Sequence, residues 1–301
     1  MKISIISSFY NMDRYLSGFL ENVISQKNFT KKIELVIELN KPSIYAERLL
    51  KSYGNKYKKN FVILKTSKLK GLYSSWNTCI KKANGSYLAI WNVDDRRTPN
   101  SLDIQSKLLF KKNISFAYGN FNVVSSHDNK NARIKLIDIS KLSSDELNKS
   151  MIIGPFFMFK KNVVKKIGYF DEKLKSASDF DFALRLANQY KGSYTKKNLG
   201  YYLDEGKGLS TSKRIDTEFE TDFIYFRYGI RKKIALNFHK KIKSSKNNIY
   251  FYEKFGKRVK LENDFTNLKK LQITNKFKYK RKFVDKYAIL RIFKFYFKKF
   301  F

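Results

Sequence analysis

The sequence predicts an α/β fold, a mostly parallel sheet flanked by helices, followed by a basic and mainly helical C-terminal extension. In the first third of the chain, short apolar runs alternate with segments in which apolar residues recur at helical spacing. Such alternation is typical of a parallel sheet covered by helices. Hydrophobic residues make up 43% of the 301 residues and aromatic residues 16%, which suffices for a core and excludes a wholly disordered chain.

The first elements follow from apolar spacing and from capping residues. Residues 2–8 form a short apolar run that ends in small polar residues, which predicts a buried strand. A helix is expected over about 15–26, with Asn11 and Asp13 offered as its N-terminal caps. Residues 33–39 predict a second buried strand.

The following segments repeat the same alternation. Ser43 predicts the cap of a helix that extends to about residue 53, and the pair Asn84-Gly85 predicts the end of a later helix. Pro99 fits the first turn of another helix. The remaining strands are expected over 61–64 and 87–91, and the remaining helices over 75–83 and 99–110.

Polar residues follow three of these strands, at 8–11, 38–40 and 92–95. Parallel strands end at the same edge of a sheet, and open α/β sheets bind ligands beyond that edge. These three segments are therefore the first places to look for a binding site.

Charge divides the chain into two parts. Lys and Arg number 63 and Asp and Glu 26, which gives a net charge of +37. Residues 231–301 hold 23 Lys and Arg against 4 Asp and Glu, so we expect a domain over 1–230 and a basic, aromatic-rich extension over 231–301. The excess favours a polyanionic partner, such as nucleic acid, anionic lipid or a phosphorylated substrate, or else reflects an A+T-rich genome.

Several classes of protein are excluded by what the sequence lacks. Cys79 is the only cysteine, and His127 and His239 are the only histidines, so a disulfide framework, a cysteine-rich zinc site and a histidine metal cluster are excluded. No apolar run reaches the 18–20 residues or so that a membrane span needs, and the N-terminus has no signal-peptide pattern. The expected location is cytoplasmic.

Two adjacent carboxylates, Asp94 and Asp95, end the fourth strand. Neither a dinucleotide-binding glycine motif nor a Walker loop is present. Carboxylates without a nearby histidine suit Mg²⁺ or Mn²⁺ bound to a diphosphate. The alternative is that they cap the helix that follows at Pro99.

Motifs spread over residues 1–212 resemble family-2 glycosyltransferases, and they occur in the order typical of that family. They are ISIISSFYN at 3–11, GLYSSWN at 71–77, ANGSYL at 83–88, NVDDRRTP at 92–99, GPFFMFKK at 154–161, VKKIGYFDE at 164–172 and SDFDFALR at 178–185. The resemblance implies a GT-A fold with a Rossmann-like sheet. It also implies an inverting, hexosyl-type glycosyltransferase of polysaccharide biosynthesis, which uses a nucleotide diphosphate sugar, with a UDP-sugar favoured.

The resemblance places a donor site at the strand ends. Asp94 takes the metal-binding place of the family's Asp-x-Asp motif and would hold Mg²⁺ or Mn²⁺, while Asn92 replaces its first acid. Asp95 either joins the metal shell or caps the next helix, and Glu38 either binds the nucleoside or is a solvated acid. The expected donor-binding residues are Ser8, Tyr10, Glu38, Lys70, Asn77, Asn92, Val93 and Asp94.

The resemblance places the general base at Asp179, with Ser178 in place of the acid that precedes it in the family. The alternative for Asp179 is an N-terminal helix cap. The loop at 206–211 either folds over the donor or is a plain surface loop. The expected acceptor-side residues are Gly154, Pro155, Phe156 and Asp181, and the expected acceptor is a glycan or polyprenyl-linked hydroxyl.

The tail, residues 287–301, combines a basic face and an aromatic face on a helical wheel. This pattern is typical of a helix that lies on an anionic membrane surface, and the alternative is a helix packed on the domain. Membrane binding would place the protein at the inner face of the membrane. Two rival functions are a nucleic-acid-binding protein, which no known motif supports, and a sugar-binding domain without activity, which Asn92 suggests.

Overall fold

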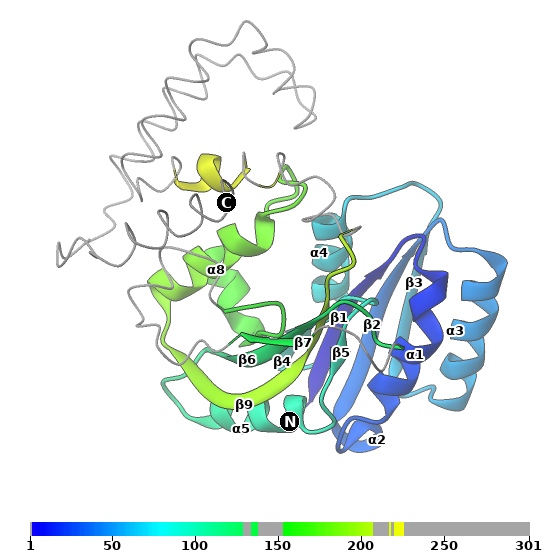
Figure 1. Ribbon diagram of the computed structural model, residues 1–301, viewed down its shortest axis with the longest axis horizontal. Helices are drawn as coiled ribbons and strands as arrows, with labels where there is room; N and C mark the ends of the chain where they lie inside the picture. Colours follow the sequence, from blue (N-terminus) through cyan, green and yellow to red (C-terminus); the bar gives the residue numbers. More distant parts are fainter. Residues whose placement is uncertain (1, 129–133, 138–152, 207–216, 218–219, 226–301) are drawn as a thin grey trace, which may run out of the picture.

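A computed structural model describes residues 2–128, 134–137, 153–206, 217 and 220–225. It contains a nine-stranded sheet covered by helices (Figure 1). The expected C-terminal extension, 231–301, lies outside the described residues, as does most of the loop at 206–211.

Four parallel strands form the N-terminal half of the sheet, in the order β3-β2-β1-β4. Every residue of β2 is buried, and so is nearly every residue of β1, because helices cover both faces of this part of the sheet. The four strands are β1 (Ile3–Phe9), β2 (Ile33–Asn40), β3 (Phe61–Thr66) and β4 (Tyr87–Ile90).

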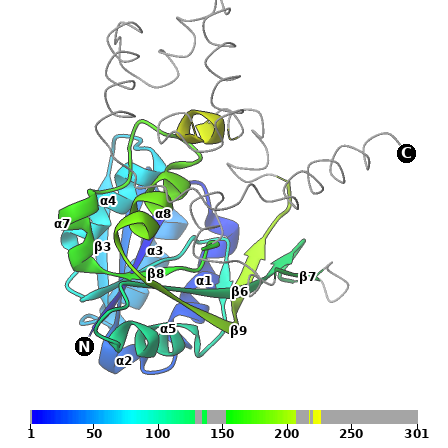
Figure 2. The ribbon, with the colours of Figure 1, turned by 90° about the vertical axis from the view of Figure 1, so that its left-hand side faces the viewer.

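The helices lie on opposite faces of the sheet, as Figures 1 and 2 show. One core cluster joins the sheet to α1 (Asp13–Ile24), α3 (Ile44–Lys56) and α5 (Ser101–Phe110). A second cluster joins the other face to α4 (Leu72–Lys82), α7 (Val164–Ile167) and α8 (Ser178–Gln189). Two further helices are short, α2 (Phe29–Lys32) and the 3₁₀ helix η1 (Lys161–Val163).

The second half of the sheet mixes strand directions. Strand β8 runs antiparallel to β4 and to β6, whereas β6 and β9 are parallel to each other. As a result β1, β2, β3, β4, β6 and β9 all point the same way, which confirms a mostly parallel sheet. The added strands are β5 (Arg96–Arg97), β6 (Phe116–Val124), β7 (Ile134–Ile137), β8 (Met158–Lys160) and β9 (Gly192–Leu203).

Helix caps confirm one prediction and correct two. Ser43 is the N-cap of α3, and its hydroxyl accepts a 3.0 Å hydrogen bond from the backbone N–H of Ala46. The N-cap of α1 is Met12, so neither Asn11 nor Asp13 caps it; the Asp13 carboxylate instead accepts a hydrogen bond from Ser43.

The second correction concerns α5. Its N-cap is Asn100, so Asp95 lies too many residues before the helix to cap it.

Among the described residues, no helix is both long and apolar enough to cross a membrane.

Candidate functional site

The carboxyl ends of β1, β2, β4, β6 and β9 share one edge of the sheet. Hydrogen bonds to β1 hold the segment that follows β4 at this edge. The Ser7 hydroxyl donates a 2.8 Å hydrogen bond to the carbonyl of Trp91, and the Trp91 N–H donates to Ile6. These bonds place residues 92–95 beside the end of β1.

A buried ion pair lies at the end of β2. Glu38 is 2% exposed, and the ammonium of Lys70 lies 2.7 Å from its Oε1, while Oε2 has no hydrogen-bond partner. Asn40 connects this pair to β1, because its amide donates to the Ser8 hydroxyl at 3.3 Å and accepts from the Lys70 backbone at 3.1 Å. The structure thus brings Ser8, Glu38 and Lys70 together, and it adds Asn40, which lies in the expected segment 38–40 but is not among the predicted donor-binding residues.

Tyr10 follows β1 and is 49% exposed, which leaves its ring available to a ligand. The next residue, Asn11, has a φ of 52°, and this left-handed turn redirects the chain toward α1.

The two adjacent carboxylates after β4 differ in surroundings. Asp95 is 1% exposed, and its Oδ1 accepts a 3.1 Å hydrogen bond from the backbone N–H of Leu203, so it ties the segment to β9. Burial first, and then the charge of Asp94, raise the pKa of Asp95 well above its usual range. The Asn92 side chain also hydrogen-bonds to Asp95. Asp95 therefore anchors the sheet, which argues against the predicted place in a metal shell.

Asp94 is partly exposed at the same edge. Burial raises the pKa of its carboxyl, and the charge of Glu205, just beyond β9, raises it further. An N–H of the His127 ring contacts the carbonyl of Asp94 at 2.8 Å. Val93, between Asn92 and Asp94, is buried at 2% exposure and is therefore a core residue.

Glu205 is held by two side chains of α1, and the sequence analysis missed it. The Tyr15 hydroxyl donates to its Oε2 at 3.0 Å, and the Arg14 guanidinium lies 2.5 Å from its Oε1. The signal that could have found Glu205 is its position directly after a strand that ends at this edge.

These residues fit a divalent cation that is shared with a phosphate ligand. Among the described residues no group of three or more His, Cys, Asp or Glu side chains could hold a metal ion alone. Mg²⁺ is usually held by one or two carboxylates together with substrate phosphates and water, and Asp94 with Glu205 supplies such a set. Carboxylate oxygens of this kind suit Mg²⁺ or Mn²⁺.

Asp179 lies in the first turn of α8. Its Oδ1 accepts a 2.9 Å hydrogen bond from the Phe180 N–H and a 3.3 Å hydrogen bond from the hydroxyl of Tyr73, at the start of α4. Burial raises the pKa of Asp179 to about 6, although these hydrogen bonds oppose the rise. The N-cap of α8 is Ala177. Asp179 is therefore not the cap, and Tyr73 is a contact that the sequence analysis missed.

Asp181 is buried and bound on its own helix, which argues against the expected acceptor role. Its Oδ2 accepts from the guanidinium of Arg185 at 2.8 Å, and Arg185 also donates to the carbonyls of Ile167 and Tyr169. The pair fastens α8 to the end of α7.

The amide of Asn77 is likewise used within the protein rather than aimed at the strand ends. It donates to the carbonyl of Phe170 and to Glu172, both at 2.9 Å, and accepts from the N–H of Phe170 at 3.0 Å. Asn77 holds the segment that leads to α8, so the structure does not support its predicted contact with a donor.

The expected acceptor-side segment is partly a core segment. Phe156 is 1% exposed, and its ring packs 5.1 Å from the buried guanidinium of Arg97 and 6.0 Å from the ring of Phe121. Phe156 therefore belongs to the core rather than to an open wall. Gly154 has a φ of +64°, and Pro155 is partly exposed.

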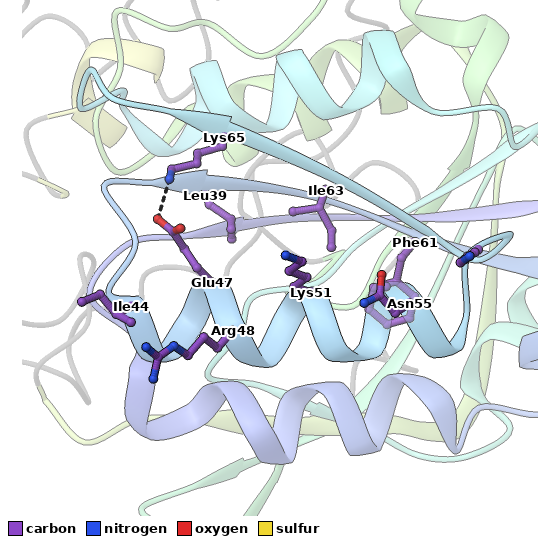
Figure 3. Close-up of a pocket in the computed structure, with 11 residues that line it drawn as sticks. Leu39, Ile44, Glu47, Arg48, Lys51, Asn55, Phe61, Ile63 and Lys65 are labelled. Carbon is purple, nitrogen blue, oxygen red and sulfur yellow. Dashed lines mark ion pairs between the residues drawn. The ribbon is translucent and has the colours of Figure 1, made fainter.

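A separate trough of about 620 Å³ lies between α3 and the edge strand β3 (Figure 3). Apolar side chains, including Leu39 and Ile63, face basic ones, including Arg48 and Lys51. None of the predicted site residues lines it, so it is distinct from the sheet edge that carries Asp94 and from the start of α8, which carries Asp179.

Comparisons with known proteins agree with this arrangement. The sequence profile described as glycosyl transferase family 2 matches residues 4–168, more than half of the chain. An uncharacterized glycosyltransferase of Methanocaldococcus jannaschii is 30% identical over 201 residues, which cover 63% of this chain and 66% of that protein.

A second relative is the Escherichia coli UDP-Glc:alpha-D-GlcNAc-diphosphoundecaprenol beta-1,3-glucosyltransferase WfgD, 28% identical over 153 residues. The match covers 50% of this chain and 57% of that protein. The matched part of the chain thus spans 66% and 57% of the lengths of these two relatives, less than two thirds in both cases.

Two solved structures share the fold. S. aureus TarS 1-349 in complex with UDP-GlcNAc has a TM-score of 0.61 at 19% identity, covering 91% of this chain and 79% of TarS. A mannosyltransferase from Pyrobaculum calidifontis in complex with GDP-Man and Mn²⁺ has a TM-score of 0.59 at 12% identity, covering 92% and 82%. At such identity the likeness concerns the fold.

Proposed function

The chain belongs to glycosyl transferase family 2, and from this membership we propose that it transfers a hexose, with inversion, from a UDP-sugar to a hydroxyl of a glycan or a lipid-linked glycan. The fold is that of the GT-A enzymes. The observation that carries the proposal is that one edge of the sheet gathers Glu38, Lys70 and Asp94. In addition, Asp179 accepts a hydrogen bond from Tyr73, which lies on α4.

The nucleoside would bind at the ends of β1 and β2. Glu38, paired with Lys70, is the proposed acceptor for a ribose hydroxyl or a base N–H, and the exposed Tyr10 ring can stack on the base. The similar UDP-Glc-dependent glucosyltransferase and the TarS complex with UDP-GlcNAc support a UDP-sugar as the donor class.

Asp94 and Glu205 would hold Mg²⁺ or Mn²⁺ against the diphosphate, as the Mn²⁺ in the similar mannosyltransferase complex suggests. A bound cation neutralises the charge that develops on the leaving diphosphate. It would also lower the pKa of the Asp94 carboxyl, which burial otherwise raises, and so favour the ionised form of Asp94.

Asp179 is the proposed general base. As the acceptor oxygen attacks the anomeric carbon, its proton passes to the Asp179 carboxylate, and the bond from that carbon to the diphosphate oxygen breaks. UDP leaves with the bonding electron pair, so the configuration inverts in one displacement. A positioned base typically contributes about 10²–10⁴-fold to such a step.

The relative that acts on a diphosphoundecaprenol-linked sugar supports a polyprenyl-linked acceptor. We also propose the division into a catalytic domain over 1–230 and a basic extension over 231–301 that attaches to an anionic membrane surface at the cytoplasmic side. The family match disfavours nucleic-acid binding as the main function.

The test is release of UDP from a panel of UDP-hexoses, with Mn²⁺ or Mg²⁺ and with lipid extracts as the acceptor source. Asp94→Ala should remove metal-dependent donor binding in a calorimetric titration, because it removes the partly exposed carboxylate that is proposed to hold the metal at the diphosphate. Its melting temperature should stay near that of the unmodified protein, since Asp94, unlike Asp95, lies outside the core.

Glu47→Gln provides the matched control, because Glu47 is an exposed carboxylate on α3 that pairs with Lys65 at the surface. Donor binding by Asp94→Ala equal to that of Glu47→Gln would refute the assigned metal ligand. A chain that binds UDP-sugars but releases no UDP with any acceptor extract would instead be a sugar-binding domain without activity.

A further inference from the structure

Residue Glu220 lies beyond the last segment that the family profile matches, yet its carboxylate is buried at 3% exposure. It accepts hydrogen bonds from three consecutive backbone N–H groups, at 2.8 Å from Lys175, 2.8 Å from Ser176 and 2.9 Å from Ala177. The Ser176 hydroxyl adds a fourth bond at 3.1 Å. A buried carboxylate that accepts four hydrogen bonds from one short segment holds that segment firmly.

The three residues that Glu220 grips lead directly into α8. Ala177 is the N-cap of that helix, and its carbonyl accepts from the N–H of Asp181. Asp179 lies only two residues after Ala177, so the backbone that Glu220 holds determines where the Asp179 carboxylate lies. The carboxylate itself accepts hydrogen bonds from the Tyr73 hydroxyl on α4 and from the Phe180 N–H.

Apolar packing supports the same arrangement. Ile224 and Tyr225, on the helical turn that carries Glu220, pack with Leu174, Ala177, Phe180 and Leu184. The Tyr225 ring meets the Phe180 ring edge-on at 5.7 Å. Figures 1 and 2 both show this short segment, in yellow, beside α8.

We propose that Glu220 is a positioning residue for the general base: it fixes the start of α8 so that the Asp179 carboxylate meets the acceptor hydroxyl. The inference rests on the proposed function, in which Asp179 takes the proton. Residues 220–225 are then part of the catalytic unit.

The charge of Glu220 also acts on the base. It raises the pKa of Asp179, after the larger effect of burial, whereas the Tyr73 hydroxyl lowers it. The charged groups on α8 itself, Asp181 and Arg185, are paired with each other. Loss of the Glu220 charge therefore lowers the pKa of Asp179, an effect that a purely structural contact would not produce.

The experiment measures UDP release by the full chain, with Mn²⁺ and the UDP-hexose that it cleaves fastest, between pH 4.5 and 8. Glu220→Gln should lower the maximal rate roughly tenfold or more, because displacement of a reacting group by about 1 Å is costly. The acid limb of the rate should also move to lower pH. Titration with UDP alone should give an affinity within about twofold of that of the unmodified chain.

Glu220→Asp keeps the charge but shortens the side chain, so it should lower the rate without moving the acid limb, and it decides the question if Glu220→Gln does not fold. Glu47→Gln is the control for loss of a distant carboxylate. A folded Glu220→Gln or Glu220→Asp protein with the unmodified rate would overturn the inference. Asp179→Asn distinguishes failure of the proposed base from failure of the role proposed for Glu220. A fully active Asp179→Asn protein would refute Asp179 as the base. If Asp179→Asn is inactive, the Glu220 variants alone test the positioning role.

Discussion

The pKa of Asp179 matters for both catalysis and stability. Burial raises it from 3.8 to about 6, so the folded protein favours the protonated form more than the unfolded chain does. The resulting cost to the folded state is absent below about pH 3.8 and is complete above about pH 6. A base with a pKa near 6 is ionised at neutral pH and still accepts a proton readily.

Asp179→Asn should therefore have opposite effects on activity and stability. We expect sugar transfer to fall by roughly 10²-fold or more, because an amide cannot take the proton. We expect the free energy of unfolding at pH 7 to rise by roughly 1–3 kcal/mol, from the relief of a shift of about two pKa units. Denaturant titrations and UDP-release rates measure the two quantities.

The pH dependence provides the control for this prediction. The stability gain of Asp179→Asn should vanish when the unfolding of both proteins is measured well below pH 3.8, because Asp179 is then protonated in the folded and the unfolded state. The rate of the unmodified protein should fall about tenfold for each pH unit below 6. A stability gain that is independent of pH would contradict the assigned pKa.

At the scale of elements, the turn between α4 and β4 is built around a buried carboxylate. Glu34 of β2 accepts from the Ser4 hydroxyl at 2.6 Å, from the Asn84 N–H at 2.6 Å and from the Gly85 N–H at 3.2 Å. A Cβ on Gly85 would lie 2.5 Å from the Ser4 hydroxyl and 2.8 Å from the carbonyl of Lys2. Only glycine leaves room for this turn to pack against β1.

Gly85→Ala should lower the free energy of unfolding by about 1–3 kcal/mol, because the added methyl group meets backbone atoms that cannot move aside. Gly71→Ala is the matched control, since a Cβ there would have no atom within 4 Å and the backbone is extended. It should change stability by about 0.5 kcal/mol or less. Urea unfolding compares the two, and equal losses would contradict the packing argument.

The N-terminal half of the fold was predictable because each of its elements shows its own periodicity. The strands and helices expected between residues 2 and 110 all occur, with ends shifted by a few residues. The caps of α1 were not predictable, because Asp13 bonds to Ser43 of a distant segment rather than to its own helix. Beyond residue 116, β6 and β9 lie far apart in the sequence, and their pairing has no local signal.

At the scale of the whole molecule, the same contrast applies to the site. Ser8, Glu38 and Lys70 lie close together because parallel strands end at the same edge of the sheet. The alternation of strands and helices in the sequence predicts this arrangement. Glu205 and Tyr73 reach the site through chain segments whose course only tertiary packing decides. Phe156, predicted at the acceptor side, lies instead under the buried Arg97, and no periodicity reveals that packing.

A further prediction concerns the tail, residues 287–301, which lies outside the described residues. Truncation after Lys280 should weaken attachment to anionic vesicles, because it removes the basic and aromatic residues of 281–301. Each basic residue near such a surface contributes about 1 kcal/mol. Sedimentation with vesicles should show binding by the full chain that falls with added salt, since the Debye length shrinks from about 10 Å at 0.1 M to 3 Å at 1 M.

Melting curves of both chains accompany the sedimentation. A truncated chain that melts well below the full one, together with a full chain that ignores anionic vesicles at low salt, would show that the tail packs on the domain instead.

The hydrogen bond from the Leu203 N–H to Asp95 joins residues 108 positions apart, and this distance sets an order of events during synthesis. At about 5–20 residues per second, a ribosome needs roughly 5–20 s to travel from one to the other. Strands β1 to β4 all lie before residue 91, so they are already synthesised and can pair with one another in that interval. At that stage the nascent chain holds a partial sheet in which the Asp95 carboxylate lacks its hydrogen bond from Leu203. This part of the site is complete only after β9 has been synthesised.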